Sequence, residues 1–261
     1  MMDPIKAVFA LAMRVQLRTK RTLVLSLVSA LPIAGTLLFV AASRLKLGEG
    51  AQTVIGAAGD VMTFFYLSFL LLAITLFYAT AIVGDEIEEK TITYLFVRPV
   101  PRSTIFLGKF LAALALSSAM ILTSASISFS VLLSADSPAE AASHVWIFIQ
   151  DLAILALGTV AYSALFGFIG ARFKRALLIG LAFALTWETA VTYLPGYLSH
   201  LTVMHYLQSL LPHPSGQRGV LEFFQAPTSA PAAVLTLAAI TGGFVALACY
   251  TVSRKEYVLD A

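Results

Sequence analysis

Long apolar stretches alternate with short polar connectors along almost the whole chain. A helix needs about twenty residues to cross the hydrocarbon core of a bilayer, and six stretches have roughly that length or more. They are Leu23–Ala42, Val61–Val83, Thr104–Leu133, Val145–Ala171, Ala176–Leu194 and Ala232–Val252. The third is longer than a span requires, so we expect it to tilt or to begin in the cytoplasm. The pattern predicts an all-α polytopic membrane protein, with residues 1–261 forming a single transmembrane domain.

The first twenty-one residues have a different periodicity. At 100° per residue one face is apolar and the opposite face is basic. The apolar face carries Ile5, Val8, Phe9, Leu11, Ala12 and Val15, and the basic face carries Lys6, Arg14, Arg18 and Arg21. This arrangement predicts an interfacial helix over residues 1–21 along the inner membrane surface. A basic flank that only sets topology would carry the same charge, and both interpretations can hold together.

Composition supports the membrane class and excludes several others. Hydrophobic residues make up 59% of the chain and charged residues 12%, with a mean hydropathy of +0.88, whereas soluble domains carry about a quarter charged residues. The single cysteine, Cys249, excludes a disulfide or a cysteine metal cluster within one chain. The net charge is only +3 and no basic stripe alternates with aromatic residues, so no nucleic-acid partner is expected.

Two further exclusions concern nucleotide binding and secretion. Gly108–Lys109 lacks the upstream glycine and the following Ser/Thr of a P-loop, so the chain is not expected to bind ATP in that way. The basic N-terminal region and the apolar stretch after it are both longer than in a secretory signal, so we expect this segment to be retained.

The Lys and Arg residues predict how the spans are oriented, because cytoplasmic connectors carry an excess of them. One set of connectors holds Lys6, Arg14, Arg18, Lys20, Arg21, Lys90, Arg98, Arg102, Lys109, Arg172, Lys174, Arg175, Arg254 and Lys255. The other set holds only Arg44, Lys46 and Arg218. We therefore expect both termini and the segment 84–103 to be cytoplasmic.

That segment has the densest charge in the chain and reads GDEIEEKTITYLFVRPVPRSTIFLGK from Gly84 to Lys109. Asp85 and Glu86 follow a glycine, where a helix N-terminus would favour negative charge. Pro99 disfavours helical geometry at Arg98, so the helix is expected to end at or before that residue. A short surface helix with apolar residues beside charges is suited to docking on a cytoplasmic partner. A solvated connector that only satisfies topology is the alternative.

The connector 195–231 on the opposite side is also long, and it is rich in Leu, Tyr and Phe. An apolar helical stripe runs through it and ends at Pro212, with members Leu201, Met204, Leu207 and Leu211. We expect short interfacial or re-entrant helices here before the last span.

Two acids, Glu188 and Asp151, fall at membrane depth, where acids are costly and are functional hypotheses by default. Glu188 is a candidate translocation or gating residue. The interpretation we favour is a structural acid that accepts hydrogen bonds from re-entrant backbone or from a tyrosine. Asp151 lies near the outer interface beside Trp146, where a wetted or capping role is expected.

Other polar and small residues are candidates for sites or for packing. All four histidines, His144, His200, His205 and His213, are on the outer side, where an imidazole metal site is conceivable. Because His200 and His205 are five residues apart, which is poor for one helical face, we expect no metal. Small residues recur in the third and fourth spans and predict close helix packing rather than a substrate path: Ser117, Ser124 and Ser128, then Ser163, Gly167 and Ala171.

The residue order of the charged segment resembles the cytoplasmic signature of type 2 ABC exporter permeases. The matching positions are Glu86, Lys90–Thr91, Tyr94–Leu95, Arg98–Pro99–Val100, Arg102 and Gly108–Lys109. Family members have glycine before the threonine, where this chain has Lys90. The stretches Trp187–Glu188, Leu194–Pro195–Gly196 and His205–Tyr206–Leu207 are similar to the small six-span branch of that family.

This resemblance implies a partner and a mechanism. Two permease copies would pair, as a homodimer in the simplest case, and each would engage a separate ABC ATPase subunit that binds ATP and Mg²⁺. The chain itself would hold no cofactor, have no catalytic residue and lie in the inner (cytoplasmic) membrane. The resemblance assigns ATPase coupling to Asp85, Glu86, Glu89, Thr91, Tyr94, Leu95, Arg98, Pro99, Arg102, Arg172 and Lys174.

Three alternatives come from other classes. A secondary carrier would show inward-facing charged pairs and internal repeats, and the sequence has no convincing repeat. An intramembrane hydrolase needs a nucleophile and a base at one depth, but the histidines are in outer connectors. A membrane scaffold could instead transmit force to an extracytoplasmic accessory protein. The cargo stays open among drug, lipid, peptide, polysaccharide intermediate and ion.

Overall fold

A computed structural model describes residues 4–45, 54–88, 101–135, 138–188, 191, 200–212 and 228–254. Within these ranges the chain is helical and has no strand. In chain order the helices are α1 (Pro4–Leu17), α2 (Lys20–Arg44), α3 (Val54–Asp60), the π-helical η1 (Val61–Leu70), α4 (Leu71–Glu88), α6 (Arg102–Leu133), α7 (Pro138–Arg172), α8 (Ala176–Ala182), the π-helical η2 (Phe183–Glu188), α10 (Val203–Ser209) and α11 (Ala230–Arg254).

Five helical stretches are long and apolar enough to cross a membrane: Lys20–Arg44, Gly56–Gly84, Arg102–Leu133, Glu140–Arg172 and Ala230–Arg254. They correspond to five of the six predicted spans. The predicted span Ala176–Leu194 appears among the described residues as a shorter apolar helix, Ala176–Glu188. The predicted all-α polytopic membrane fold is therefore confirmed. The far end of the short span lies outside the described residues.

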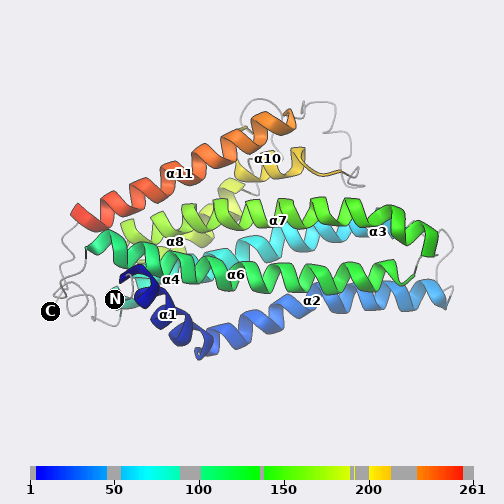
Figure 1. The fold of residues 1–261 in the computed structure, drawn as a ribbon, viewed down its shortest axis with the longest axis horizontal. Helices are drawn as coiled ribbons and strands as arrows, with labels where there is room; N and C mark the ends of the chain where they lie inside the picture. Colours follow the sequence, from blue (N-terminus) through cyan, green and yellow to red (C-terminus); the bar gives the residue numbers. More distant parts are fainter. Residues whose placement is uncertain are drawn as a thin grey trace.

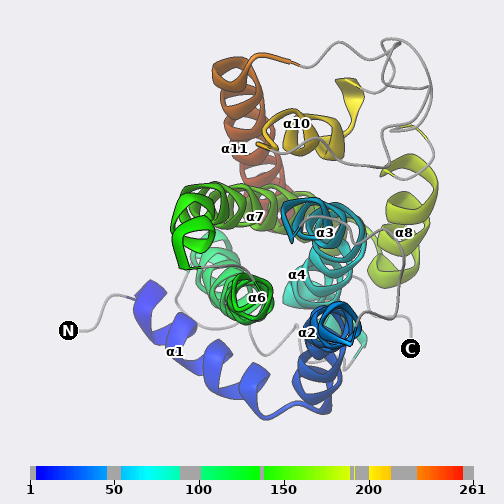
Figure 2. The same cartoon turned by 90° about the vertical axis from the view of Figure 1, so that its right-hand side faces the viewer.

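The long helices run side by side, and two short helices lie across them (Figure 1 and Figure 2). α4 packs most extensively against α7, which also contacts α6 and α11. α1 crosses the bundle beside α6 and α2, and α10 lies crosswise between α7 and α11. The first turn of α1 and the last turn of α11 lie at the same end of the molecule (Figure 1). We call this the termini end.

The helix predicted over residues 1–21 corresponds to α1 and is shorter than expected, because α1 ends at Leu17 and Lys20 already begins α2. Thr19 between them has an extended backbone, with φ −77° and ψ 145°. Its hydroxyl donates to the Gln16 carbonyl at 2.7 Å, as does the Thr22 hydroxyl at 2.5 Å. Threonine side chains compete well for backbone partners, which accounts for a turn where helical periodicity alone predicts continuity.

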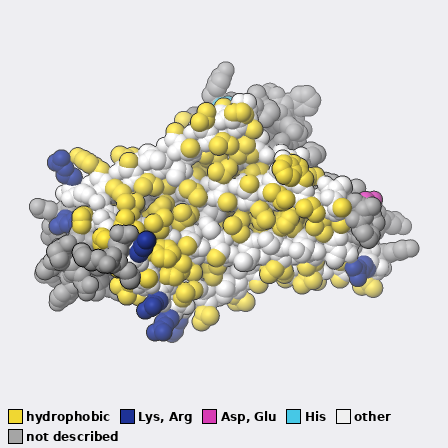
Figure 3. Space-filling model, in the orientation of Figure 1, with side chains coloured by type: hydrophobic (Ala, Val, Ile, Leu, Met, Phe, Trp, Pro, Cys, Tyr) yellow, Lys and Arg dark blue, Asp and Glu magenta, His cyan; other side chains and the backbone are white. Residues whose placement is uncertain are grey.

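Burial divides the long helices into central and peripheral ones. In the stretch Gly56–Gly84, 72% of the most apolar window is buried, against 22% for α2 and 17% for α11. The peripheral helices expose large apolar side chains such as Leu27, Leu38 and Leu235. The visible face is correspondingly covered by hydrophobic side chains, and most Lys and Arg gather near the termini end (Figure 3). Such a surface fits hydrocarbon rather than water.

Candidate functional site

The connection between α4 and α6 is the first candidate site, because it holds most of the predicted ATPase-coupling residues. Its central part, residues 89–100, lies outside the described residues. That part contains the predicted coupling residues Glu89, Thr91, Tyr94, Leu95, Arg98 and Pro99, which therefore stay predictions. The described flanks are the last turns of α4 and the first turns of α6.

The expectation that a new helix begins after Gly84 is wrong for the described residues, because α4 continues through Gly84 to Glu88. Asp85 and Glu86 therefore lie near the C-terminal end of a long helix. A single glycine costs a helix only about 1 kcal/mol, and a Cβ at Gly84 would meet no atom within 4 Å. Nothing there forces a break.

Gly108 and Lys109 hold the start of α6 against two other helices. The Lys109 ammonium donates to the Ile82 carbonyl of α4 at 3.4 Å. A Cβ on Gly108 would lie 2.8 Å from the Val8 side chain and 3.2 Å from the Ile5 carbonyl oxygen, both on α1. The glycine thus permits close approach of α1. Together the two residues join α1, α4 and α6 at the point where the chain returns to the bundle.

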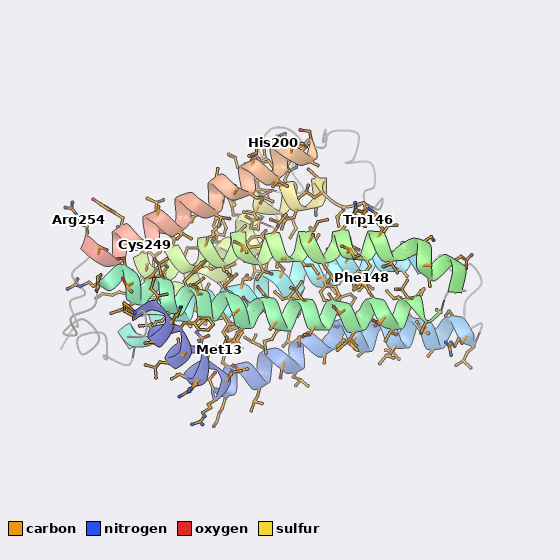
Figure 4. The ribbon with its side chains drawn as sticks, in the orientation of Figure 1. Met13, Trp146, Phe148, His200, Cys249 and Arg254 are labelled. Carbon is orange, nitrogen blue, oxygen red and sulfur yellow. The ribbon has the colours of Figure 1, made fainter. Side chains whose placement is uncertain are left out.

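The remaining predicted coupling residues also lie at the termini end. Arg102 is the first residue of α6, and Arg172 is the last residue of α7. The Arg172 guanidinium lies 5.7 Å from the centre of the Phe173 ring. Lys174 is exposed in the turn between α7 and α8. In Figure 4, Arg254 of α11 lies at this same end and Trp146 of α7 toward the opposite end, as the predicted topology requires.

Glu188 is the second candidate site and it is almost fully buried, with 1% of its surface exposed. The Tyr162 hydroxyl of α7 donates to Oε2 at 2.8 Å. The backbone N–H of Val203 donates to Oε1 at 3.2 Å and that of Met204 to Oε2 at 3.2 Å. Three donors converge on a carboxylate, which is an acceptor-only group when ionised. We call these four residues the Glu188 cluster.

The cluster confirms the geometry of the favoured interpretation of Glu188, an acid that accepts hydrogen bonds from connector backbone and from a tyrosine. The two N–H groups belong to the first turn of α10, where backbone N–H groups have no acceptor within their own helix. Thr202 caps the same turn, since its hydroxyl accepts from the His205 N–H at 3.3 Å. Glu188 thereby fixes α10 to α7 and η2. Sequence reasoning did not identify Tyr162 as the donor, because nothing in its local pattern distinguishes it from other tyrosines of the spans.

A second buried polar group shows that the serines of α6 serve helix packing, as predicted. The Tyr66 hydroxyl lies 3.0 Å from the Ser124 hydroxyl and 2.7 Å from that of Ser128. Ser124 in turn donates to the Ser29 carbonyl of α2 at 2.5 Å. Ser117 donates to Ala113 of its own helix at 2.8 Å. The hydroxyls of Tyr66, Ser124 and Ser128 thus join η1, α6 and α2, whereas that of Ser117 is bonded within α6.

The small residues of α7 also mark close packing, but the closest approach to backbone that we find is at Gly170 rather than in the predicted series. A Cβ there would lie 2.8 Å from the Thr80 carbonyl oxygen and 3.1 Å from its Cα. At Gly167 the nearest atoms, on Ile82, Phe106 and Phe110, would be at 3.7 Å. Ser163 and Ala171 are both buried. Among these positions of α7, the approach of backbone to backbone is at Gly170, where α7 passes Thr80 of α4.

His200 and His205 lie together, contrary to the spacing argument. Their ring centres are 4.3 Å apart, because His200 precedes α10 in a tight turn instead of continuing its helix. His205 Nε2 is 3.1 Å from the Thr228 hydroxyl. Burial, reinforced by the neighbouring His200, lowers the pKa of His205. Within the described ranges no group of three or more His, Cys, Asp or Glu residues could hold a metal ion.

Asp151 lies within α7 and its side chain is fully buried. The wetted position predicted from its nearness to Trp146 is therefore wrong. Trp146 itself is 65% exposed, so the two residues, five apart, lie on different faces of α7.

Comparison with known families accounts for this architecture. A family model described as ABC-2 family transporter protein matches residues 16–190. The match runs from the end of α1 through the α4–α6 connection to just past Glu188. A comparison with curated proteins gives no match. The chain belongs to the ABC-2 transporter family, and it is a multi-pass membrane permease component of an ABC transporter.

Proposed function

We propose that this chain is the permease subunit of an ABC exporter, driven through the α4–α6 connection by a separate ATPase subunit. ATP and Mg²⁺ bind to that partner and not to this chain. Two copies pair in the inner membrane with both termini in the cytoplasm. In each copy, residues 1–261 form a single transmembrane domain. Closure of the ATPase dimer pushes the connection, and the bundle changes between inward- and outward-facing states.

The observation that carries the proposal is the anchoring of both flanks of the connection. Lys109 bonds the α4 carbonyl of Ile82, and Gly108 admits α1 at Val8. A force on residues 89–100 acts on α4 and α6 at once, and α1 is held against the same point. A connector that only satisfied topology would need no such contact between its two ends.

Docking is tested by purifying the permease with its ATPase, whose gene we expect beside that of the permease. The double variant Glu86→Ala/Glu89→Ala should lose co-purification and coupled ATP hydrolysis. Glu140→Ala is the matched control, because Glu140 is an exposed acid in the first turn of α7 at the opposite end. Unchanged binding and unchanged coupled hydrolysis in the double variant would refute docking through this segment.

Transmission is tested separately from docking with Lys109→Met. This variant keeps the apolar stem and removes the donor to Ile82, so ATPase binding should persist while transport per ATP falls. If transport stays coupled at the wild-type ratio, the contact has no part in transmission.

Orientation is tested by labelling intact cells with a membrane-impermeant maleimide. In a Cys249→Ser background, His144→Cys should be labelled from outside and Arg254→Cys only after the membrane is opened. The reverse pattern would invert the proposed topology.

A scaffold that transmits ATPase motion to an extracytoplasmic partner is the second candidate function. The Glu188 cluster favours keeping it, because Glu188 fixes α10, which is part of the connector 195–231, to α7. Export and scaffolding are distinguished by reconstitution: an exporter moves a cargo across vesicles with the ATPase alone, and a scaffold does not. A secondary carrier would need neither the ATPase nor ATP.

A further inference from the structure

The central helix of the bundle changes its geometry along its length. Its part η1, Val61–Leu70, is π-helical, whereas α4 continues from Leu71 as an ordinary α-helix. At the junction the Leu71 N–H donates to the Tyr66 carbonyl, five residues back. Within η1 the Ser68 hydroxyl donates to the Thr63 carbonyl, again five residues back, at 2.8 Å. π-Helical stretches are rare, are mostly single turns and are frequent at functional sites, so one of ten residues within a span needs an explanation.

The local sequence does not impose this geometry. Residues 61–70 read VMTFFYLSFL and contain neither glycine nor proline, the usual causes of a local departure from the α-helix. Only Thr63, Tyr66 and Ser68 among them are polar. An α-helical register would therefore also present apolar side chains on almost every face. Both registers are open to the same sequence, and contacts with other helices decide between them.

The packing of η1 follows its π-helical register. Phe64 and Phe69, five residues apart, are both exposed, at 55% and 47%. Met62 and Leu67, also five apart, are both fully buried. In an α-helix, residues five apart point about 140° away from each other, so each pair would be split between two faces. With α4 held in place, an α-helical register would turn Phe64 away from its present face, whereas Phe69, next to α4, would move little.

The Tyr66 hydroxyl holds η1 in its present register. It lies 3.0 Å from the Ser124 hydroxyl and 2.7 Å from that of Ser128, both on α6, and all three side chains are buried. A π-helix advances by roughly 15° less per residue than an α-helix, because its bonds span one residue more. Over the five residues between Tyr66 and Leu71, an α-helical register would rotate Tyr66 by about 75°. That rotation carries the hydroxyl away from both serines.

Two buried polar atoms near the start of η1 are not satisfied in the present register. Asp60 Oδ1 and the Thr63 hydroxyl are buried and have no hydrogen-bond partner among the described residues. Buried polar groups are satisfied in the great majority of cases. In an α-helical register both residues would turn relative to α4 by roughly a third of a turn. The present register thus satisfies the polar side chain in the middle of η1 and leaves those at its start without partners.

The two parts of the central helix are held by different kinds of contact. α4 is held through its backbone: a Cβ at Gly170 of α7 would lie 2.8 Å from the Thr80 carbonyl oxygen, and Lys109 of α6 donates to the Ile82 carbonyl at 3.4 Å. η1 is bonded to α6 through the side-chain hydroxyl of Tyr66. A change of register would therefore turn η1 and α3, which lies toward the end opposite the termini end (Figure 1), while α4 stays in place.

From these observations we infer that η1 is a two-state segment that changes between a π-helical and an α-helical register, and that Tyr66 holds it in the π-helical one. The change turns the end of the central helix that lies away from the termini end and leaves α4 packed against α7. The inference deepens the proposed function and rests on it in one respect, the change of the bundle between inward- and outward-facing states. The register change itself requires neither the ATPase nor a cargo.

The test measures distances between two spin labels on the full chain in nanodiscs, in a Cys249→Ser background. One label is attached at Leu235→Cys of α11, which is 71% exposed, and the other at Phe64→Cys or Phe69→Cys. Tyr66→Phe should raise the population of a second distance for the pair 64/235 about tenfold, because it removes the hydrogen bonds that hold the π-helical register. The distance for the pair 69/235 should change little in every variant.

Substitutions on α6 and α4 assign the effect to the bonds of Tyr66. Ser124→Ala/Ser128→Ala removes the same bonds from the other side and should raise the same second distance. Ser117→Ala is the matched control, because Ser117 is a buried serine of α6 that donates within its own helix. Tyr78→Phe removes a buried tyrosine hydroxyl from α4 and should also leave the distance unchanged. No second distance in Tyr66→Phe and the double serine variant, or the same second distance in either control, would overturn the inference. Equal broadening for both label pairs would indicate general loosening and would overturn it too.

Adding the ATPase with Mg²⁺ and ATP separates this inference from the proposed function. In the wild type, nucleotide should raise the same second distance for the pair 64/235. If Tyr66→Phe raises it and nucleotide does not, η1 has two states but the proposed drive by the ATPase is wrong. If nucleotide raises it and Tyr66→Phe does not, Tyr66 does not hold the register and the inference is overturned.

Discussion

Replacing Glu188 by glutamine should loosen α10 from α7 and η2 while leaving the bundle folded. The two carboxylate oxygens accept from Tyr162 at 2.8 Å and from the N–H groups of Val203 and Met204 at 3.2 Å each. Glutamine has one acceptor oxygen and one NH₂ group. With the amide oxygen at the Oε2 position, the bonds from Tyr162 and Met204 persist, but the NH₂ group faces the Val203 N–H. The opposite orientation keeps only the bond from Val203 and is worse.

The cost follows from that count. A hydrogen bond to a charged group contributes about 1.5–3 kcal/mol, and a buried donor left unsatisfied costs about 1–3 kcal/mol. The two terms overlap, so Glu188→Gln should destabilise the attachment of α10 by about 2–4 kcal/mol. Glu188→Ala removes both acceptor oxygens and with them all three hydrogen bonds, so it should cost more. Tyr162→Phe leaves two donors on the carboxylate and should cost less than Glu188→Gln.

Hydrogen exchange read by mass spectrometry measures this attachment directly. Each 1.4 kcal/mol corresponds to a factor of ten, so peptides covering 203–209 should exchange about 30-fold to several hundred-fold faster in Glu188→Gln. Peptides from the interior of α6 should be unchanged. Glu140→Gln is the matched control, since it makes the same change at an exposed acid. If the protection of 203–209 is unchanged in both Glu188→Gln and Glu188→Ala, the cluster does not hold α10.

Two further predictions concern packing and pH. Gly170→Ala should destabilise the protein by about 1–3 kcal/mol, the usual cost of overpacking, because the new Cβ meets the Thr80 backbone at 2.8 Å. Gly242→Ala on α11, where a Cβ meets nothing within 4 Å, is the control and should be neutral or stabilising. Equal thermal unfolding temperatures of the two variants would contradict the contact. Burial and the neighbouring His200 lower the pKa of His205 in the folded protein. Near and below about pH 6.5, the ordinary pKa of histidine, the unfolded chain therefore binds more protons at this residue than the folded protein does. The contribution of neutral His205 to the free energy of unfolding should be full above about pH 6.5 and should be lost as the pH falls toward the lowered folded pKa. A thermal-stability titration should therefore be flatter for His205→Gln than for the wild type, and identical titrations would exclude His205 as the titrating group.

The spans could be predicted from sequence because hydrocarbon leaves the backbone few choices. A chain that must satisfy every N–H and C=O internally forms helices wherever twenty apolar residues follow one another. Local breaks were harder to predict. Gly84, Asp85 and Glu86 were expected to start a helix, but they continue α4. Thr19, with no glycine or proline beside it, lies in the turn that separates α1 from α2. Side-chain competition for the Gln16 carbonyl decides the second case, and that competition depends on the tertiary contact of Thr22 with Tyr78.

In the candidate sites, too, the sequence predicted local features but not contacts between distant residues. Sequence identified Glu188 and the kinds of group that would bond to it, because a buried acid at membrane depth needs donors. It could not identify Tyr162, twenty-six residues away on another helix. It also separated His200 from His205, because it treated them as one helix when a turn lies between them. The coupling roles of Glu89, Thr91 and the other residues within 89–100 stay predictions.

The contacts of α4 suggest why the two candidate sites belong to one mechanism. Lys109 anchors α6 to the Ile82 carbonyl, and Gly170 brings α7 against Thr80, less than one turn away on α4. Tyr162, which bonds Glu188, is eight residues before Gly170 on the same α7 helix, about 12 Å by helical rise. If the α4–α6 connection is displaced as proposed, the motion would be passed to α7 through this backbone contact, where flexible side chains cannot absorb it. On the proposed mechanism, α10 moves with α7 as long as Glu188 holds it. Glu188→Gln should therefore uncouple α10 from α7 without weakening ATPase docking. Glu86→Ala/Glu89→Ala should weaken ATPase docking and leave α10 attached to α7.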